Sequence, residues 1–292
     1  MSHELYLWAA GRKIAVISYD ALDDRWSLTY DEAWAADPQT FPLSPALPLI
    51  RPESGYTSST LRRFIEHLLP EGRALDVAVA YNGVAKSNVF GLIRALGGET
   101  AGALRFTADA VDVEPVDKPA PREIPLQELD ERIAKRESVP FTAWDGKVRM
   151  SVAGLQDKLL VYIDRPLSDG GRLFLVDGRR LASTHILKPD TGQERTPHLA
   201  VNEHFCMCLA DKMGLPAAQV SLLRTPRPVL LVRRFDREVH AANNQVRVHR
   251  MHIIDACQAG DLPVSYKYER NLGSAPEVRD IREGMSFERL FR

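Results

Sequence analysis

The stretch "RMSVAGLQDKLLVYI", residues 149–163, decides how the rest of the chain is interpreted. Ser151 stands near its front, the small residues Ala153 and Gly154 lie in its middle, and Lys158 precedes an apolar run typical of a strand. The stretch fits a tight hairpin. It also fits a loop that lies over phosphate groups, because small residues allow the backbone to approach a ligand closely. It matches neither the Walker pattern nor the G-x-G-x-x-G pattern, so the surrounding segments must decide.

The segments that follow form an ordered series of strands and one long helix. "KLLVYI", "GGRLFLVDG" and "STHILKP" predict strands, and the last of them carries Lys188 directly before a proline. "TPHLAVNEHFCMCLADKMGL" predicts a helix that Thr196 caps and Gly214 ends. "PVLLVRRFDR" predicts a buried strand that runs into a charged connector. This order of hairpin, strand with lysine, helix and strand is more informative than any single motif.

The first third of the chain predicts a small domain rich in strands. "ELYLWAA", "KIAVISYD" and "RWSLTY" are short, rich in β-formers and separated by turn residues. "SSTLRRFIEHLLPEG" predicts a helix that Pro70 and Gly72 stop. Its apolar residues form one stripe: Leu61, Phe64, Ile65, Leu68 and Leu69. A second helix over "KSNVFGLIRALGG" and a strand over "TAGALRF" complete this domain.

A break between domains is indicated by residues 109–125, which are rich in proline and charge as linkers are. A short amphipathic helix over "LQELDERIAKR" follows, and the second domain begins near Trp144. The sequence therefore predicts an α+β protein with two parts.

Composition excludes several classes of protein. A chain of 292 residues is long enough for about two domains, and its 45% hydrophobic and 26% charged residues are ordinary for a globular protein. The net charge of -1 creates no global field for nucleic acid or an anionic membrane. There is no apolar run of about 18 residues, no pattern of a secretory signal, and no disulfide framework in the three cysteines. We expect a soluble cytoplasmic protein that does not bind membranes.

Lys188 and Glu203 fit the chemistry of a nucleotide site. Phosphates need backbone N–H donors and a cation beyond them, which Lys188 would supply beside the loop. Glu203 lies on an otherwise apolar helix face, where a buried carboxylate needs a partner. Protein kinases pair a strand lysine with a helix glutamate in this order. Two plainer interpretations stay open, namely a hairpin with a surface lysine and a glutamate that reaches water at the edge of the apolar stripe.

With these motifs in order, the sequence resembles the HipA family, the serine/threonine kinase toxins of bacterial type II toxin–antitoxin modules. "FIEHLLPEG" and "GGETAGALRF" resemble the N-terminal domain of that family. "SVAGLQDKLLV" resembles its phosphate loop, "STHILKP" its ATP-lysine strand and "VNEHFCMCLADKMGL" the helix after it. "LLVRRFDR" resembles the hinge, and "IDACQAGDLPVSYKYE" the segment that opens the second lobe.

The resemblance implies an arrangement of domains. Residues 1–108 would form the HipA-type N-terminal domain, and 109–143 a linker with a short helix. Residues 144–235 would form a kinase-like N-lobe with the phosphate loop, and 236–292 the start of a helical C-lobe.

The resemblance also implies roles for single residues. Ser151 matches the serine that these kinases autophosphorylate, and Lys188 matches the lysine that contacts ATP, with Glu203 as its partner. The phosphate loop would comprise Ala153, Gly154, Leu155, Gln156, Asp157 and Lys158. The adenine-binding hinge would comprise Arg233, Arg234 and Phe235. The implied partners are a HipB-type antitoxin, DNA through that antitoxin, and an aminoacyl-tRNA synthetase as the substrate.

The sequence departs from the family where catalysis would occur. The catalytic loop of the family has an aspartate with an asparagine five residues later, and no asparagine of this chain follows an aspartate at that spacing. We therefore expect a chain truncated before the catalytic loop, inactive alone, with weak or absent ATP binding and Mg²⁺ only when a C-lobe is supplied. The alternative is a non-catalytic binding module that sequesters a HipB-type antitoxin or a nucleotide.

Other candidate sites are weaker. Cys206 and Cys208 with His204 suggest a metal, but residues two apart on a helix point to different sides, and His249 with His252 is a lone pair. We expect no metal site. Seven arginines between positions 224 and 250 fit a patch for nucleic-acid phosphates or, more commonly, a solvated face.

Overall fold

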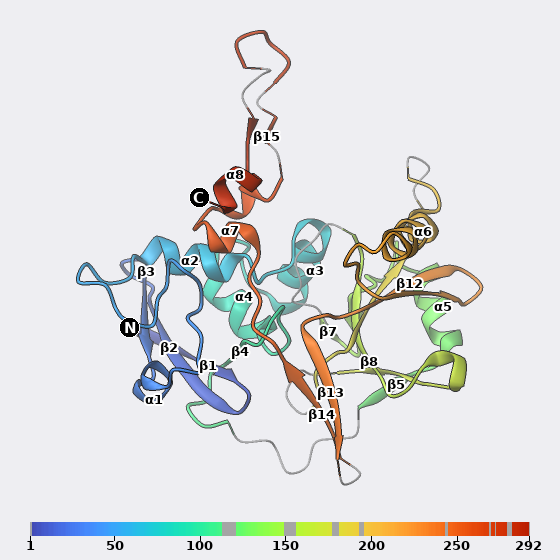
Figure 1. The fold of residues 1–292 in the computed structure, drawn as a ribbon, viewed down its shortest axis with the longest axis horizontal. Helices are drawn as coiled ribbons and strands as arrows, with labels where there is room; N and C mark the ends of the chain where they lie inside the picture. The colour runs from blue at the N-terminus through green and yellow to red at the C-terminus, as the bar shows by residue number, and fades with distance from the viewer. Residues whose placement is uncertain are drawn as a thin grey trace.

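The computed structural model describes residues 2–112, 121–148, 156–176, 181–192, 196–242, 245–268, 270–271, 273–278 and 282–291. Its two larger sheets lie apart, with helices α3 (Gly72–Asn82) and α4 (Val89–Leu96) between them (Figure 1). The architecture is a mixture of helices and antiparallel sheets in separate parts of the chain, which confirms the predicted α+β class.

The first sheet contains the strands predicted in the first third of the chain. Its order is β3 (Arg25–Tyr30), β2 (Arg12–Asp20), β1 (Ser2–Ala9) and β4 (Arg105–Thr107), and all pairs are antiparallel. Its buried residues pack with those of α4 and of α2 (Ser58–Glu66) in one core. The predicted apolar stripe of α2 and the residues after it is entirely buried there.

The chain between α2 and α4 differs from the prediction. The helix α2 begins after Thr57, whose side chain accepts a hydrogen bond from the Thr60 backbone N–H, and it ends at Glu66. Gly72 was expected only to stop this helix, but it begins α3 in a left-handed conformation with φ of +55°. Ala74 and Ala78 give α3 a buried side, so a further helix forms where the sequence analysis placed none. A short helix, α1 (Glu32–Ala36), follows β3.

The second sheet has six strands in the order β11-β12-β10-β8-β9-β5, all antiparallel. Four of them were predicted from sequence: β8 (Leu159–Ile163), β9 (Leu173–Leu175), β10 (His185–Pro189) and β12 (Pro228–Arg233). The edge strands were not: β11 (Val220–Arg224) and β5 (Arg122–Ile124). Both are short, and their residues mix polar and apolar types without clear alternation.

Different helices cover the two faces of the second sheet. Leu187 of β10 packs in a core with residues of α5 (Leu126–Ala134), whereas Ile186 packs in a core with α6 (Leu199–Lys212). We call these the α5 face and the α6 face. Successive residues of a strand alternate between faces, so Lys188 lies on the α6 face.

Part of the predicted linker belongs to this sheet. Residues 122–124 form β5, and Leu129 and Ile133 of α5 are buried in the core of the α5 face with Trp144. The predicted helix is therefore confirmed, but it packs as a layer of the second sheet and does not lie in a free linker. The division of the chain into domains at residues 108, 143 and 235 stays a prediction.

The predicted charged connector after β12 is a hairpin. Its strands are β13 (Arg237–Ala242) and β14 (Gln245–Arg250), which lie between the two larger sheets in the view of Figure 1. The helix α7 (Ala256–Ala259) follows, with Asp255 in a capping box, and it buries Cys257 and Gln258. Shorter elements complete the described chain: β6 (Ala143–Trp144), β7 (Lys147–Val148), η1 (Leu167–Asp169), η2 (Val264–Tyr266), β15 (Arg270–Asn271), β16 (Arg282–Glu283) and α8 (Phe287–Leu290).

Among the helices in the described part of the chain, none combines the length and the apolar character that a membrane span requires.

Candidate functional site

Lys188 and Glu203 meet on the α6 face of the second sheet. Strand β10 carries Lys188, and the second turn of α6 carries Glu203, so a strand and a helix position the two groups independently. The Nζ of Lys188 donates to Oε1 of Glu203 at 2.6 Å. Their side chains are 21% and 26% exposed, so the pair is partly shielded and still open to a ligand. The predicted pairing is therefore present as a contact, and its role in nucleotide binding stays a prediction.

Lys158 adds a second cation beside this pair. The register of β8 and β10 pairs Leu159 with Leu187, and the next position along places Lys158 opposite Lys188 on the α6 face. Burial, followed by the charge of Lys188, lowers the pKa of Lys158 from its ordinary value of 10.5 to about 8, although Glu71, Asp157 and Glu203 act in the opposite direction. Like charges opposite each other on a sheet are destabilising, so this juxtaposition favours an anion between or beside them.

The phosphate loop is only partly described. Ser151, Ala153, Gly154 and Leu155 lie outside the described residues. Gln156 is described, and its Nε2 lies 3.4 Å from the backbone oxygen of Pro189, which is the residue after Lys188. The end of the predicted loop is thus tied to the end of the lysine strand.

In the predicted hinge, the side chain of Arg233 lies on the face of the sheet opposite to Lys188. Arg233 lies on the α5 face, where its Nη1 donates to Oε1 of Gln219 at 2.8 Å. The backbone N–H groups of Arg233 and Arg234 donate to the carbonyls of Gln219 and Thr184, both at 2.9 Å. Phe235 is 71% exposed. The adenine role of this segment stays a prediction.

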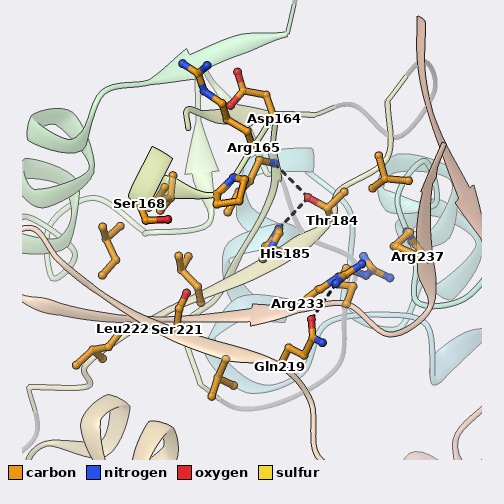
Figure 2. A pocket seen from close by; sticks show the side chains of 18 of the residues that line it. Asp164, Arg165, Ser168, Thr184, His185, Gln219, Ser221, Leu222, Arg233 and Arg237 are labelled. Carbon is orange, nitrogen blue, oxygen red and sulfur yellow. Dashed lines mark hydrogen bonds between the residues drawn. The ribbon is translucent and has the colours of Figure 1, made fainter. Parts of the chain in front are cut away.

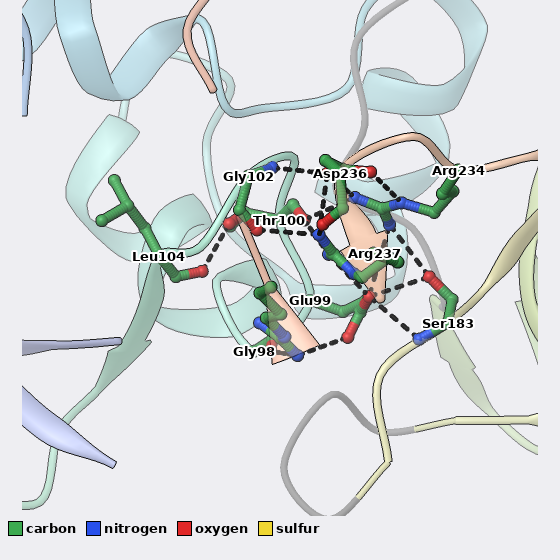
Figure 3. Close-up of polar contacts among 10 residues, drawn as sticks. Gly98, Glu99, Thr100, Gly102, Leu104, Ser183, Arg234, Asp236 and Arg237 are labelled. Carbon is green, nitrogen blue, oxygen red and sulfur yellow. Dashed lines mark hydrogen bonds and ion pairs between the residues drawn. The ribbon is translucent and has the colours of Figure 1, made fainter. Parts of the chain in front are cut away.

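Arg234 is instead part of a buried ionic network, which we call the Glu99 cluster: Glu99, Arg234, Asp236, Arg237 and Arg250 (Figure 3). Glu99 lies on the loop before β4 in the first part of the chain, and the other four residues belong to the hinge and the hairpin. Nη2 of Arg250 lies 2.5 Å from Oε2 of Glu99, and Nη2 of Arg234 lies 2.6 Å from Oδ2 of Asp236. The cluster thus joins the first sheet to the hinge.

Backbone and hydroxyl groups complete the Glu99 cluster. The carbonyl of Thr100 accepts from Arg234 at 3.1 Å and from Arg237 at 3.0 Å. The N–H of Gly102 donates to Asp236, and the hydroxyl of Ser183 donates to Glu99, both at 2.8 Å. Gly102 has φ of +72°, and a Cβ there would lie 2.9 Å from a backbone oxygen of Ile253, so only glycine fits this contact.

The cluster keeps its carboxylates ionised. Burial alone would raise the pKa of Glu99, but the guanidiniums of Arg250, Arg237 and Arg234 outweigh it, and the pKa is lowered. Burial lowers the pKa of Arg237 to about 10, which still leaves it charged at neutral pH. Neither a nucleic-acid patch nor a solvated face is therefore correct for Arg234, Arg237 and Arg250, because their side chains are 1–11% exposed and ion-paired with Glu99 or Asp236.

A second ionic contact joins the first part of the chain to the segment after the hairpin. Nζ of Lys267 lies 3.0 Å from Oε1 of Glu71 and 3.1 Å from Oδ2 of Asp255. Asp255 also lies 3.2 Å from Nδ1 of His67, and although burial acts against it, this contact helps hold the pKa of Asp255 far below its usual range. The hydroxyl of Tyr268 donates to Glu71 at 3.0 Å. The segment from 255 to 268 is therefore fixed to α2 and to the start of α3.

The two candidate metal sites, His204 with Cys206 and Cys208 and the pair His249 and His252, are not supported by the described residues. Nowhere in them do three His, Cys, Asp or Glu residues approach as a metal site requires. Cys208 contacts His204 at 3.6 Å, whereas Cys206 is exposed. His252 stacks on Phe41 and contacts the backbone oxygen of Leu43, away from His249.

Comparison with known proteins places the chain in a family. Residues 5–107 match the HipA N-terminal domain, and residues 150–290 match the HipA-like C-terminal domain. The chain is 39% identical over 279 residues to the serine/threonine-protein kinase toxin HipA of Shewanella oneidensis, covering 95% of this chain and 60% of that protein. It is 36% identical over 288 residues to a putative kinase of Sinorhizobium fredii, covering 96% of this chain and 64% of that one.

A solved structure matches as well. The complex of HipA, HipB and operator DNA from Shewanella oneidensis contains a chain with a TM-score of 0.78 and 37% identity, covering 98% of this chain and 63% of that chain. The chain thus spans between 60% and 64% of the length of these relatives.

Proposed function

The chain belongs to the HipA family, and from this premise we propose that it binds ATP on the α6 face of its second sheet, as the nucleotide-binding part of a toxin–antitoxin serine/threonine kinase. The observation that carries the proposal is the meeting of Lys158, Lys188 and Glu203 on that face. Two neighbouring lysines, one of them buried, offer the positive charge that the phosphates of a nucleotide require.

Each described residue has a distinct part in this proposal. Lys188 contacts the phosphates, and Glu203 orients its ammonium group from the helix. Lys158 adds charge from the adjacent strand, and Gln156 holds the loop end against the lysine strand. The loop from Ser151 to Leu155 would cover the phosphates, with Ser151 as the site of autophosphorylation, as the resemblance implies. Mg²⁺ would neutralise phosphate charge when the second lobe supplies its ligands.

The test is the stabilisation of the chain by ATP with Mg²⁺. We expect ATP to raise the melting temperature, and Lys188→Met to abolish this rise, because the variant removes the phosphate cation but not the fold. Lys212→Met is the matched control, since Lys212 is an exposed cation on the last turn of α6. An equal ATP-dependent rise in Lys188→Met would place the nucleotide elsewhere.

We expect this chain alone not to transfer phosphate from ATP. Its sequence contains no aspartate followed five residues later by an asparagine, and phosphoryl transfer depends on such a base and on metal ligands. Incubation of the purified chain with labelled ATP and Mg²⁺ should therefore leave Ser151 unmodified, as mass spectrometry can establish. Phosphate on Ser151 would contradict the expected inactivity.

For partners, we propose a HipB-type antitoxin, with DNA reached through it. Support comes from the relative solved as a complex of HipA, HipB and operator DNA, whose HipA chain matches 98% of this chain. An aminoacyl-tRNA synthetase as substrate rests on the family resemblance alone. Co-purification with a HipB-type antitoxin tests the partner. Binding of the antitoxin without binding of ATP would favour the second candidate, a non-catalytic module that sequesters the antitoxin.

A further inference from the structure

A cavity of about 850 Å³ opens on the α5 face, on the side of the second sheet opposite to Lys188. Its walls come from β10, β11 and β12, from the turn between β8 and η1, and from the start of β13 (Figure 2). The strand register explains its placement. His185 and Arg233 are partners across β10 and β12, and both alternate away from the α6 face. The cavity is therefore separate from the proposed nucleotide site, with one sheet between them.

The floor of the cavity is apolar. Leu231 is 3% exposed and belongs to the core of the α5 face, and Ile163 and Leu223 pack against that core from the neighbouring strands. These three side chains line the cavity where the helix α5 does not cover the sheet. A ligand with an apolar or planar body would cover this apolar surface, and the removal of the surface from water would favour binding.

The rim of the cavity is cationic. Arg165, Arg224 and Arg233 line it, and none of them has a carboxylate within ion-pair distance among the described residues. The hydrogen bonds of Arg165 and Arg233 go to neutral oxygens, at Gly170 and Gln219. The carboxylate in the lining, Asp164, is already paired with Arg172 at 3.1 Å.

The inner end of the cavity holds a buried guanidinium. Arg237 lines it, its side chain is 1% exposed, and its Nε has no hydrogen-bond partner within the described chain. His185 supplies no opposing charge. Burial and the neighbouring Arg233 lower its pKa to about 4, so its imidazole is neutral at physiological pH. A buried cationic group with an unused donor next to an open cavity favours a negatively charged occupant.

We propose that this cavity is a second binding site, which takes a small organic anion with an apolar body. The anionic group lies against Arg233 and the guanidiniums beside it, and the body lies on Leu231 and Ile163. The volume lies within the range of small-molecule sites, about 300–1,000 Å³. Because Arg234 and Arg237 belong both to the lining and to the Glu99 cluster, the occupant would lie directly against the junction between the two parts of the chain.

The experiment uses the full chain and 1-naphthalenesulfonate as the probe, because its charge does not change with pH. Isothermal titration should give saturable binding. The neutral 1-naphthalenemethanol should bind about tenfold more weakly or worse, and inorganic sulfate likewise, since each lacks one half of the interaction. ATP should not compete, because the sheet separates the sites.

Two variants assign the binding to this cavity. Arg233→Gln removes the central cation and should weaken the probe about tenfold. Ser221→Trp fills the cavity from β11 and should abolish binding, with circular dichroism as the check on folding. Lys188→Met and Lys212→Gln, which remove cations on the other side of the sheet, should leave the affinity unchanged.

Each outcome either supports or contradicts the proposed site. Loss of affinity in Arg233→Gln with retention in Lys188→Met supports the site. Equal affinity of the neutral and anionic probes, unchanged affinity in Arg233→Gln, or competition by ATP would each overturn it. If Ser221→Trp does not fold, the affinity of Arg233→Gln for the probe decides whether the site exists. Arg233 is exposed and glutamine is a small change, so this variant should fold.

Discussion

Two ionic sites lie near opposite ends of the same strand, β10. Before its first residue, Ser183 donates to Glu99 in a cluster whose side chains are between 1% and 11% exposed. At the other end, Lys188 pairs with Glu203 with about a quarter of each side chain open to solvent. Carboxylates paired with cationic side chains therefore occupy two environments that differ in access to water and in the number of partners.

The difference separates a structural site from one suited to a ligand. In the Glu99 cluster each carboxylate is contacted by more than one guanidinium and by backbone or hydroxyl donors, so the cluster holds the two parts of the chain together. At Lys188 the ammonium group contacts the carboxylate of Glu203 and has Lys158 beside it. Excess positive charge with solvent access is what a phosphate group needs.

Glu99→Ala should give the largest effect. It leaves three buried guanidiniums with one carboxylate, and loss of one partner from a buried ion pair costs about 3–5 kcal/mol. Urea denaturation measures the free energy of unfolding. Glu137→Ala is the control, since its side chain is 81% exposed and its contact with Arg73 is long, at 3.7 Å. A loss below about 1 kcal/mol for Glu99→Ala would remove the contrast between the two sites.

Lys158→Met should have the next largest effect on the free energy of unfolding, and this effect should depend on pH. The pKa of Lys158 falls to about 8 on folding, from an ordinary value of 10.5, so between these pH values the unfolded chain binds more protons. The stability of the wild type should therefore rise relative to the variant from pH 8 to pH 10.5, by about 2–3 kcal/mol. Chemical denaturation at pH 7.5, 9 and 10.5 measures the difference. Parallel pH profiles for both chains would show that Lys158 titrates normally.

Lys188→Met should change stability little. Partly exposed ion pairs contribute about 1 kcal/mol or less, because solvent screens them and ordering the side chains costs entropy. The unfolding free energy should thus fall by under about 1 kcal/mol, while the response to ATP disappears. A loss of several kcal/mol would mean that Lys188 is as structural as Glu99, and the contrast would fail.

Salt should give the smallest effect and still distinguish the sites. At 1 M salt the Debye length is about 3 Å, against about 10 Å at 0.1 M, so exposed charges are screened. The cost of Lys188→Met should shrink by a few tenths of a kcal/mol, whereas the cost of Glu99→Ala should persist. Repeating both denaturation series in 1 M sodium chloride measures this. Equal salt sensitivity in the two variants would argue that water reaches the Glu99 cluster.

The sequence predicted the Lys188–Glu203 contact because local patterns encode both partners. A short apolar strand fixes the direction of Lys188, and helical spacing fixes the face of Glu203. Most strands and the helix stripe of the first part were predicted for the same reason. The weaker edge strands β5 and β11 were not, because the strands that they pair with determine them more than their own residues do. The β13–β14 hairpin, whose strands pair with each other, was not predicted either.

The Glu99 cluster could not be predicted from sequence. Glu99 lies 135 positions before Arg234, and nothing in its local sequence marks it as buried. The arginines between 224 and 250 have the composition of a solvated face, and only their spatial meeting with Glu99 and Asp236 reverses that interpretation. Gly102 was the one local signal that sequence analysis could have used, because its left-handed conformation lets this loop approach the backbone of Ile253 closely.

The Glu99 cluster also limits how this protein can be recombined in evolution. The regions that match the two HipA domains look like exchangeable modules, but the loop of residues 98–102 and the segment 234–250 form one ionic network. A chimaera that takes one module from a distant relative would inherit half of that network and bury unmatched charge. We therefore expect a chimaera to fold well only when its loop and its hairpin come from relatives in which the two halves of the network match.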